Sequence, residues 1–249
     1  MSKEVWKPGN MLYPLPAVMV SCVRPGGRPN IITVAWAGTI CSSPAMISIS
    51  IKPERYSYAI IRETGEFVVN LTTGKLARAA DYCGVRSGRD VDKFQETRLT
   101  AAPAAHVAAP LIEESPVNIE CRVRDVIELG SHHMFLSEVL GVDVDSRYLD
   151  DKGRLRLNDA DLCVYSHGSY YSLGENIGSF GFSVRKRDIQ RRDTQERGVQ
   201  KRDAQKKNAQ KRDVSEQDMQ KRYALKRGVR EQDTQKRYAQ KKDVRERRK

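Results

Sequence analysis

The chain has 249 residues, and its 44 lysines and arginines exceed its 32 aspartates and glutamates by twelve. All of this excess lies after Lys186, because residues 1–186 contain equal numbers of acidic and basic residues. The basic character is therefore a property of the C-terminal part, and residues 1–186 are expected to form a neutral globular domain.

No apolar stretch has the length of a signal peptide or of a membrane span, so we expect a cytoplasmic protein without a membrane partner. Five cysteines are spread along the chain: Cys22, Cys41, Cys83, Cys121 and Cys163. Their number is odd and none forms a CxxC pair, so neither a zinc or other metal site nor a disulfide framework is expected.

The first predicted elements are two strands, at 15–23 and 30–37, separated by the turn signal RPGGRP. Residues 45–52 alternate between apolar and polar and predict a third strand. A short helix is predicted over 54–63, ending before Gly65.

Four further strands are predicted, at 66–71, 117–129, 132–144 and 162–166, with a helix over 73–82. The two strands of thirteen residues are longer than most, which suits a barrel better than an open sheet. Most strands follow one another with helices inserted between them. The pattern therefore predicts a mainly β fold, a barrel with a few inserted helices.

The common cofactor and catalytic motifs GxGxxG, GxxxxGK[ST], HExxH and GxSxG are absent from the sequence. Small polar residues gather instead in three places: around Asn30 to Ser43, at Arg55-Tyr56-Ser57, and over residues 82–94. The last stretch places Gly84 and Gly88 beside arginines and a lysine, a combination that can hold a phosphate monoester. Each stretch taken alone is also typical of a solvated loop.

His132 and His133 begin a predicted strand, so their rings point to opposite faces and at most one can serve a given site. A structural histidine remains an alternative for either. Asn70 and Trp36 lie within predicted strands and could equally be core residues.

Residues 188–247 consist of twelve consecutive five-residue repeats such as DTQKR. Five residues turn an α-helix by about 500°, so the apolar position of each repeat forms no stripe that could pack. A charged helix or disorder is expected. A nucleic-acid-binding arm is one interpretation. The translation of a tandem DNA repeat is the preferred one, because acidic residues interrupt the basic clusters.

Several segments together resemble the flavin reductase-like family of FMN-binding split barrels, including its flavoredoxin-like members. They are NIITVAWAGTICSSPAMISISIKPERYSY, GEFVVNL, DYCGVRSGRDVDKF, PVNIEC, GSHHMFLSEV and YSHGSYY, in this order. The resemblance extends from about Tyr13 to Lys186. It implies an FMN-binding split-barrel domain over 1–186. The basic, low-complexity repeat tail over 187–249 lies outside the resemblance.

The resemblance also implies that FMN lies in a groove at a homodimer interface. The ring would pack along the strand from Asn30 to Trp36, and the loop from Thr39 to Ser43 would contact its polar edge. His132 would face the flavin, for tuning or proton delivery. The full set of expected FMN-binding residues is Asn30, Thr33, Trp36, Thr39, Cys41, Ser42, Ser43, Arg55, Ser57, Asn70, Ser87, Arg89, Lys93, His132 and Tyr165.

The expected function is that of an oxidoreductase that passes electrons from NADH or NADPH through FMN to free flavin or to a protein partner. The alternative is a flavoredoxin-type electron carrier with no nicotinamide reaction of its own. A third alternative, from another class, is nucleic-acid binding through the basic tail. The sequence does not decide between the two nicotinamide cofactors.

Overall fold

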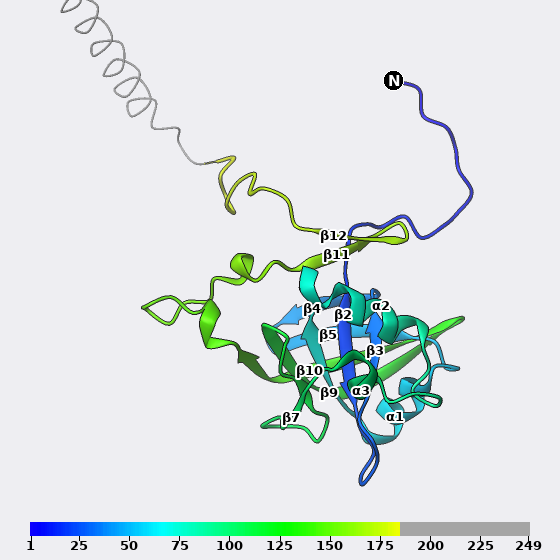
Figure 1. The fold of residues 1–249 in the computed structure, drawn as a ribbon. Helices are drawn as coiled ribbons and strands as arrows, with labels where there is room; N and C mark the ends of the chain where they lie inside the picture. Colours follow the sequence, from blue (N-terminus) through cyan, green and yellow to red (C-terminus); the bar gives the residue numbers. More distant parts are fainter. Residues whose placement is uncertain (185–249) are drawn as a thin grey trace, which may run out of the picture. The chain divides into compact units, whose positions relative to one another are not determined.

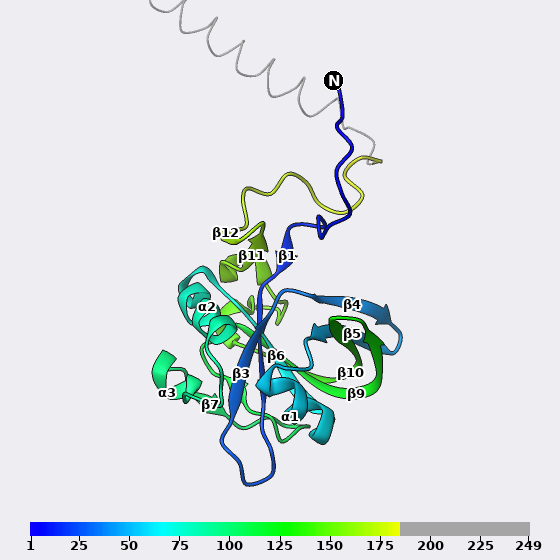
Figure 2. The ribbon, with the colours of Figure 1, turned by 90° about the vertical axis from the view of Figure 1, so that its right-hand side faces the viewer.

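The computed structural model describes residues 1–184 and has a curled antiparallel sheet of seven strands as its centre. The strands, in their order across the sheet, are β3 (Asn30–Val34), β2 (Val18–Cys22), β6 (Glu66–Leu71), β9 (Val117–Leu129), β10 (His132–Val144), β5 (Ala45–Ile51) and β4 (Ala37–Ser42). Figures 1 and 2 show the sheet bending round so that β3 and β4 return toward each other. A hydrogen bond of 2.8 Å from the Ser50 amide of β5 to the Trp36 carbonyl extends the pairing of β5 with β4 to the residue before β4. The predicted mainly β barrel is confirmed.

Two small sheets accompany the barrel. One consists of β1 (Leu15–Pro16), β11 (Cys163–Ser166) and β12 (Ser169–Ser172), and the other of β7 (Ala101–Ala102) and β8 (Leu111–Ile112). The Cys163 amide donates a hydrogen bond of 2.9 Å to the Thr72 carbonyl. This bond holds the β11–β12 hairpin close to the helices that follow Thr72. The hairpin can form one wall of a site there.

The helices are short and lie outside the barrel. They are α1 (Tyr56–Thr64), the 3-10 turn η1 (Gly74–Leu76), α2 (Ala77–Val85) and α3 (Lys93–Thr97), followed by the 3-10 turns η2 (Ser146–Tyr148) and η3 (Leu157–Ala160). α1 ends at Gly65, whose φ of 68° is the left-handed conformation that glycine adopts without strain. Asp92 caps α3 by accepting a hydrogen bond of 3.1 Å from the Gln95 amide.

Strand β2 is buried on both of its faces, and this divides the core into two parts. Val18 and Val20 point into the barrel, where they pack with Phe67 and Phe135. Met19 points outward into a second cluster between the sheet and α2 and α3, with Ile31, Leu76, Ala80, Cys83 and Phe94 among its members. The helices are therefore attached to the barrel by apolar packing on the outer face of β2 and β3.

Asn70 of β6 lies in the sheet beside β2 and is fully buried. Its side-chain amide donates to the Met19 carbonyl at 2.9 Å and to the Ser21 hydroxyl at 3.0 Å. Its carbonyl oxygen accepts from the Ile112 amide at 2.9 Å and from the Asn118 side chain at 2.7 Å. Asn70, expected from the sequence to bind FMN, thus lies in the core with its polar atoms satisfied within the protein.

The structure corrects the predicted elements mainly between Val34 and Ala45 and in the segment after α2. The strands predicted at 66–71, 117–129 and 132–144 are observed with the same bounds. Residues 39–43, expected to form a loop, instead belong mostly to β4, which pairs with β5 in a hairpin. Helix α3 was expected to be part of a loop. Met1–Glu175 form one compact unit, and the tail over 187–249, with the helix or disorder expected for its repeats, lies outside the described residues.

Within residues 1–184 no helix is both long enough and apolar enough to cross a membrane.

Replacing Asn70 with alanine should lower the free energy of unfolding by about 2–4 kcal/mol, because several buried groups lose their partner at once. Urea unfolding would measure the change. The matched control is Asn158→Ala, at an exposed position, which should change stability by less than about 0.5 kcal/mol. Equal effects of the two substitutions would contradict the structural role assigned to Asn70.

Candidate functional site

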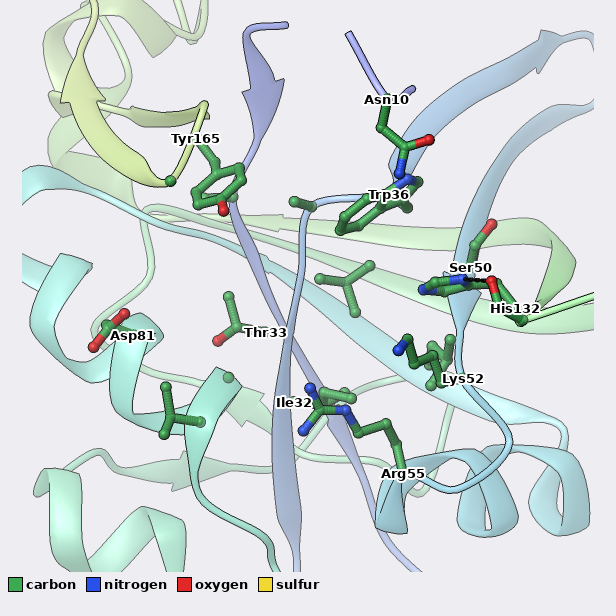
Figure 3. A pocket seen from close by; sticks show the side chains of 18 of the residues that line it. Asn10, Ile32, Thr33, Trp36, Ser50, Lys52, Arg55, Asp81, His132 and Tyr165 are labelled. Atoms are coloured by element: carbon green, nitrogen blue, oxygen red, sulfur yellow. Dashed lines mark hydrogen bonds between the residues drawn. The ribbon is translucent and has the colours of Figure 1, made fainter. Parts of the chain in front are cut away.

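The site lies at the link between β3 and β4. After Val34 the chain passes through Ala35 and Trp36 into β4, and a cavity of about 650 Å³ lies over this link. Its floor is the stretch from Ile32 to Trp36, and the end of β5 forms one side. Helix α2 and the β11–β12 hairpin form the other side, as Figure 3 shows. A cavity of this size is in the range that holds a small organic ligand.

Trp36 and His132 form one edge of this wide cavity. Their rings stack with centroids 5.5 Å apart and planes 28° from parallel. Burial, and then the nearby Lys52 ammonium, lower the pKa of His132. The imidazole is therefore neutral at pH 7 and can either donate or accept a hydrogen bond at the cavity edge.

A narrower cavity of about 280 Å³ adjoins the first, and the two share Ile32, Lys52, Arg55 and Gly84 in their linings. Five basic side chains line the narrow cavity against one acidic side chain, Glu54; they are Lys52, Arg55, Arg86, Arg89 and Lys93. The guanidinium of Arg55 makes no hydrogen bond or ion pair with any other described residue. Its forked donors are available to an anion.

The backbone around the narrow cavity also favours an anion. No side chain caps the N-terminus of α1, and Tyr56 and Ser57 of its first turn line the cavity. Free amides at a helix N-terminus attract negative charge. A Cβ atom at Gly88 would lie 2.0 Å from the Asn30 side-chain oxygen, so this loop approaches the cavity only because position 88 is glycine. Asn30 in turn donates a hydrogen bond of 2.7 Å to Ser57.

Lys93 lies beneath the narrow cavity and is buried. Its ammonium donates to the Ile31 carbonyl at 2.6 Å and to the Cys83 carbonyl at 2.7 Å. One of its three donors is left for a ligand. Burial lowers the pKa of Lys93 to about 8 and raises that of the Cys83 thiol to about 11.

Most of the residues expected to bind FMN line one of the two cavities. The wide cavity is lined by Thr33, Trp36, Arg55, His132 and Tyr165, and the narrow one by Asn30, Arg55, Ser57, Ser87, Arg89 and Lys93. The structure does not bring Thr39, Cys41, Ser42 and Ser43 to either cavity, because they lie on β4 and the turn after it, at the edge of the sheet. With Asn70, these are the expected residues that lie elsewhere.

Sequence reasoning missed several residues of the linings: Asn10, Lys52, Asp81, Arg86, Gly168 and Tyr170. A signal was present for one of them. Arg86 belongs to residues 82–94, the stretch that carried the phosphate-site prediction. The position of Tyr170 depends on the β11–β12 hairpin, and no local pattern indicates that this hairpin walls the cavity.

The two cavities together fit a ligand with two unlike ends. The wide cavity offers a flat strand floor and aromatic edges, as a planar ring system requires. The narrow cavity offers unpaired cations and free amides, as a phosphate monoester requires.

The chain matches the family model described as "Flavin reductase like domain" over residues 11–174. Among solved structures it is similar to flavoredoxin of Desulfovibrio vulgaris (Miyazaki F), with a TM-score of 0.69 and 33% identity; the match covers 74% of this chain and 100% of that one. An uncharacterised protein of Archaeoglobus fulgidus is 33% identical over 152 residues, which are 61% of this chain and 85% of that protein. An NADPH-flavin oxidoreductase of Streptomyces viridifaciens is 28% identical over 125 residues, 49% of this chain and 63% of the relative.

The buried lysine predicts a specific pH dependence of stability. The folded pKa of about 8 lies below the ordinary 10.5, so between these values the unfolded chain holds a proton that the folded chain has released. Stability from this group therefore rises with pH in that window. From pH 7.5 to 9 the wild type should gain about 1 kcal/mol relative to Lys93→Met.

Urea unfolding of both proteins at the two pH values would measure this gain. The difference between them cancels the titration of the cysteines, which both proteins share. A difference that does not change with pH would show that Lys93 keeps an ordinary pKa.

Proposed function

Since the chain belongs to the flavin reductase-like family, we propose that it binds FMN in the joined cavities and acts as an oxidoreductase. The electrons would come from NADH or NADPH and pass to free flavin or to a protein acceptor. The observation that carries this proposal is the union of a flat, aromatic-edged cavity with a narrow cationic one. FMN has a planar ring at one end and a phosphate monoester at the other.

The residues of the narrow cavity would hold the phosphate. Arg55 stands at the junction of the two cavities with its guanidinium unpaired, and Arg89 and the first turn of α1 add further donors. The third donor of Lys93 is close enough to complete the set from below. These groups supply charge and hydrogen bonds without a dinucleotide-binding motif.

The residues of the wide cavity would orient the ring. The β3 backbone provides the floor, and the stacked Trp36 and His132 limit the ring's movement and the access of water on one side. Bound FMN would supply the redox chemistry itself, accepting a hydride or single electrons. A neutral His132 at the edge could hold or deliver a proton, which agrees with the role expected for it from the sequence.

An electron carrier without nicotinamide chemistry is the second candidate. It is favoured by the flavoredoxin similarity, which covers that chain completely at 33% identity. The reductase is favoured by the NADPH-flavin oxidoreductase similarity, which covers less of both chains. Because one fold can serve both functions, the reaction with a nicotinamide must decide.

We also propose that the chain acts as a homodimer. The support is the edge strand β4, which exposes Ile40 and, with the turn after it, carries the four expected residues that line neither cavity of their own chain. An open edge strand with an apolar residue favours association. Light scattering coupled to gel filtration would measure the mass, and a monomer at all concentrations would contradict the proposal.

Arg55→Met should weaken FMN binding by about 10- to 100-fold, because a charge-assisted pair with the phosphate is lost. Quenching of flavin fluorescence during titration would measure the affinity. The control is Arg78→Met, which removes an exposed arginine that lines neither cavity and should leave FMN affinity unchanged. If Arg55→Met bound FMN like the wild type, the phosphate would lie elsewhere.

Anaerobic addition of NADH or NADPH to the FMN-loaded protein should bleach the flavin absorbance near 450 nm within seconds, on the order of typical turnover rates. This result is expected for a reductase. Bleaching by dithionite but by neither nicotinamide would instead support the carrier.

A further inference from the structure

The wide cavity has a second, acidic end whose chemistry differs from that of the phosphate end. Asp81 of α2, Tyr165 of β11 and Tyr170 of β12 line this end, which we call the acidic end. Figure 3 shows Asp81 and Tyr165 across the cavity from Lys52 and Arg55. The strand floor of β3 runs between the two ends.

The carboxylate of Asp81 has no ion-pair partner among residues 1–184. Tyr170 lines the same end of the cavity, close enough for the Asp81 charge to act on its hydroxyl. Burial, and then the negative charge of Asp81, raise the pKa of Tyr170 to about 12. The Tyr170 hydroxyl therefore stays protonated and keeps a hydrogen-bond donor at the acidic end.

Two aromatic faces stand beside this carboxylate. The rings of Tyr165 and Tyr170 have centroids 5.6 Å apart and planes 67° from parallel, so they form two walls of a corner. Aromatic faces and an anion together attract an organic cation, since both present negative potential to it. A phosphate would be repelled from the same place.

We propose that the acidic end binds a planar N-alkylpyridinium cation. The inference rests on the proposed function, in which FMN occupies the floor and the basic end, and it assigns the remaining end to the second substrate. N-alkylpyridinium rings have two sources: the oxidised nicotinamide cofactor, and pyridinium or bipyridinium electron acceptors.

The proposed reaction produces a positive charge that the Asp81 carboxylate would stabilise. When a dihydropyridine gives up a hydride, its C4–H bond breaks and both bonding electrons leave with the hydrogen. The ring then carries one positive charge, and the hydride goes to the oxidised flavin. A fixed carboxylate beside the ring stabilises that charge as it develops. Asp81 is thus a specificity-determining residue for the second substrate.

The test compares two probes that differ mainly in charge, 1-methylnicotinamide and nicotinamide. They are titrated by calorimetry into the full chain loaded with FMN, at low ionic strength. The wild type should bind the cation about 3- to 10-fold more tightly than the neutral amide. Asp81→Asn should reduce this preference to about one while leaving the affinity for neutral nicotinamide unchanged.

The matched control is Asp151→Asn, which removes an exposed carboxylate that lines neither cavity and should keep the preference. Equal binding of the two probes by the wild type would overturn the proposal. So would a preference that survives Asp81→Asn. Weaker FMN binding by Asp81→Asn, with the cation preference intact, would mean that the acidic end belongs to the flavin.

Two kinetic readouts separate the sources of the cation. If Asp81→Asn slows anaerobic reduction by NADH but leaves reoxidation by 1,1′-dimethyl-4,4′-bipyridinium unchanged, the acidic end binds the nicotinamide. If it slows the reoxidation and leaves reduction by NADH unchanged, the acidic end binds an acceptor. Flavin fluorescence tests FMN binding separately. If FMN does not bind, the same two probes titrated into the protein as purified still decide the cation site, so the two proposals fail independently.

Discussion

The burial of β2 and β3 on both faces is the constraint on which the site depends. The inner face of these strands closes the barrel core, and the outer face must be covered by other elements. Met19 and Ile31 provide the apolar surface that attracts α2 and α3. The same packing that stabilises the barrel therefore places these two helices, and the loop between them, beside the link from β3 to β4.

Polar contacts then set how these helices meet β3. Thr33 donates to the Ala80 carbonyl of α2, and Lys93 of α3 donates to the Ile31 carbonyl of β3. A buried ammonium would be costly without such acceptors, and even with them its pKa falls. The lysine therefore joins structure and binding: it ties α3 to the sheet and keeps one donor for the narrow cavity.

Much of the fold could be predicted from the sequence, because the strands 66–71, 117–129 and 132–144 have strong local patterns and the last two pair as neighbours in sequence. The hydroxyl-rich stretch from Thr39 to Ser43 misled, because small polar residues suit a loop as well as an exposed edge strand. Only the pairing with β5 shows that this stretch forms a strand, and that pairing depends on a second segment of the chain. Asn70 misled for a similar reason, because most of its partners come from other strands, namely β2, β8 and β9.

The basic part of the site was predictable because Arg55 and the residues around Gly88 carry their chemistry in short motifs. The acidic end was not, because Asp81 and Tyr170 are far apart in the sequence and meet only when the β11–β12 hairpin lies beside α2. This separation has a chemical consequence. One strand floor carries cations at one end and a carboxylate at the other, so an anionic cofactor and a cationic substrate would be held in opposite directions along it. Such a field would orient both proposed ligands before they react, without a catalytic acid or base on the floor between them.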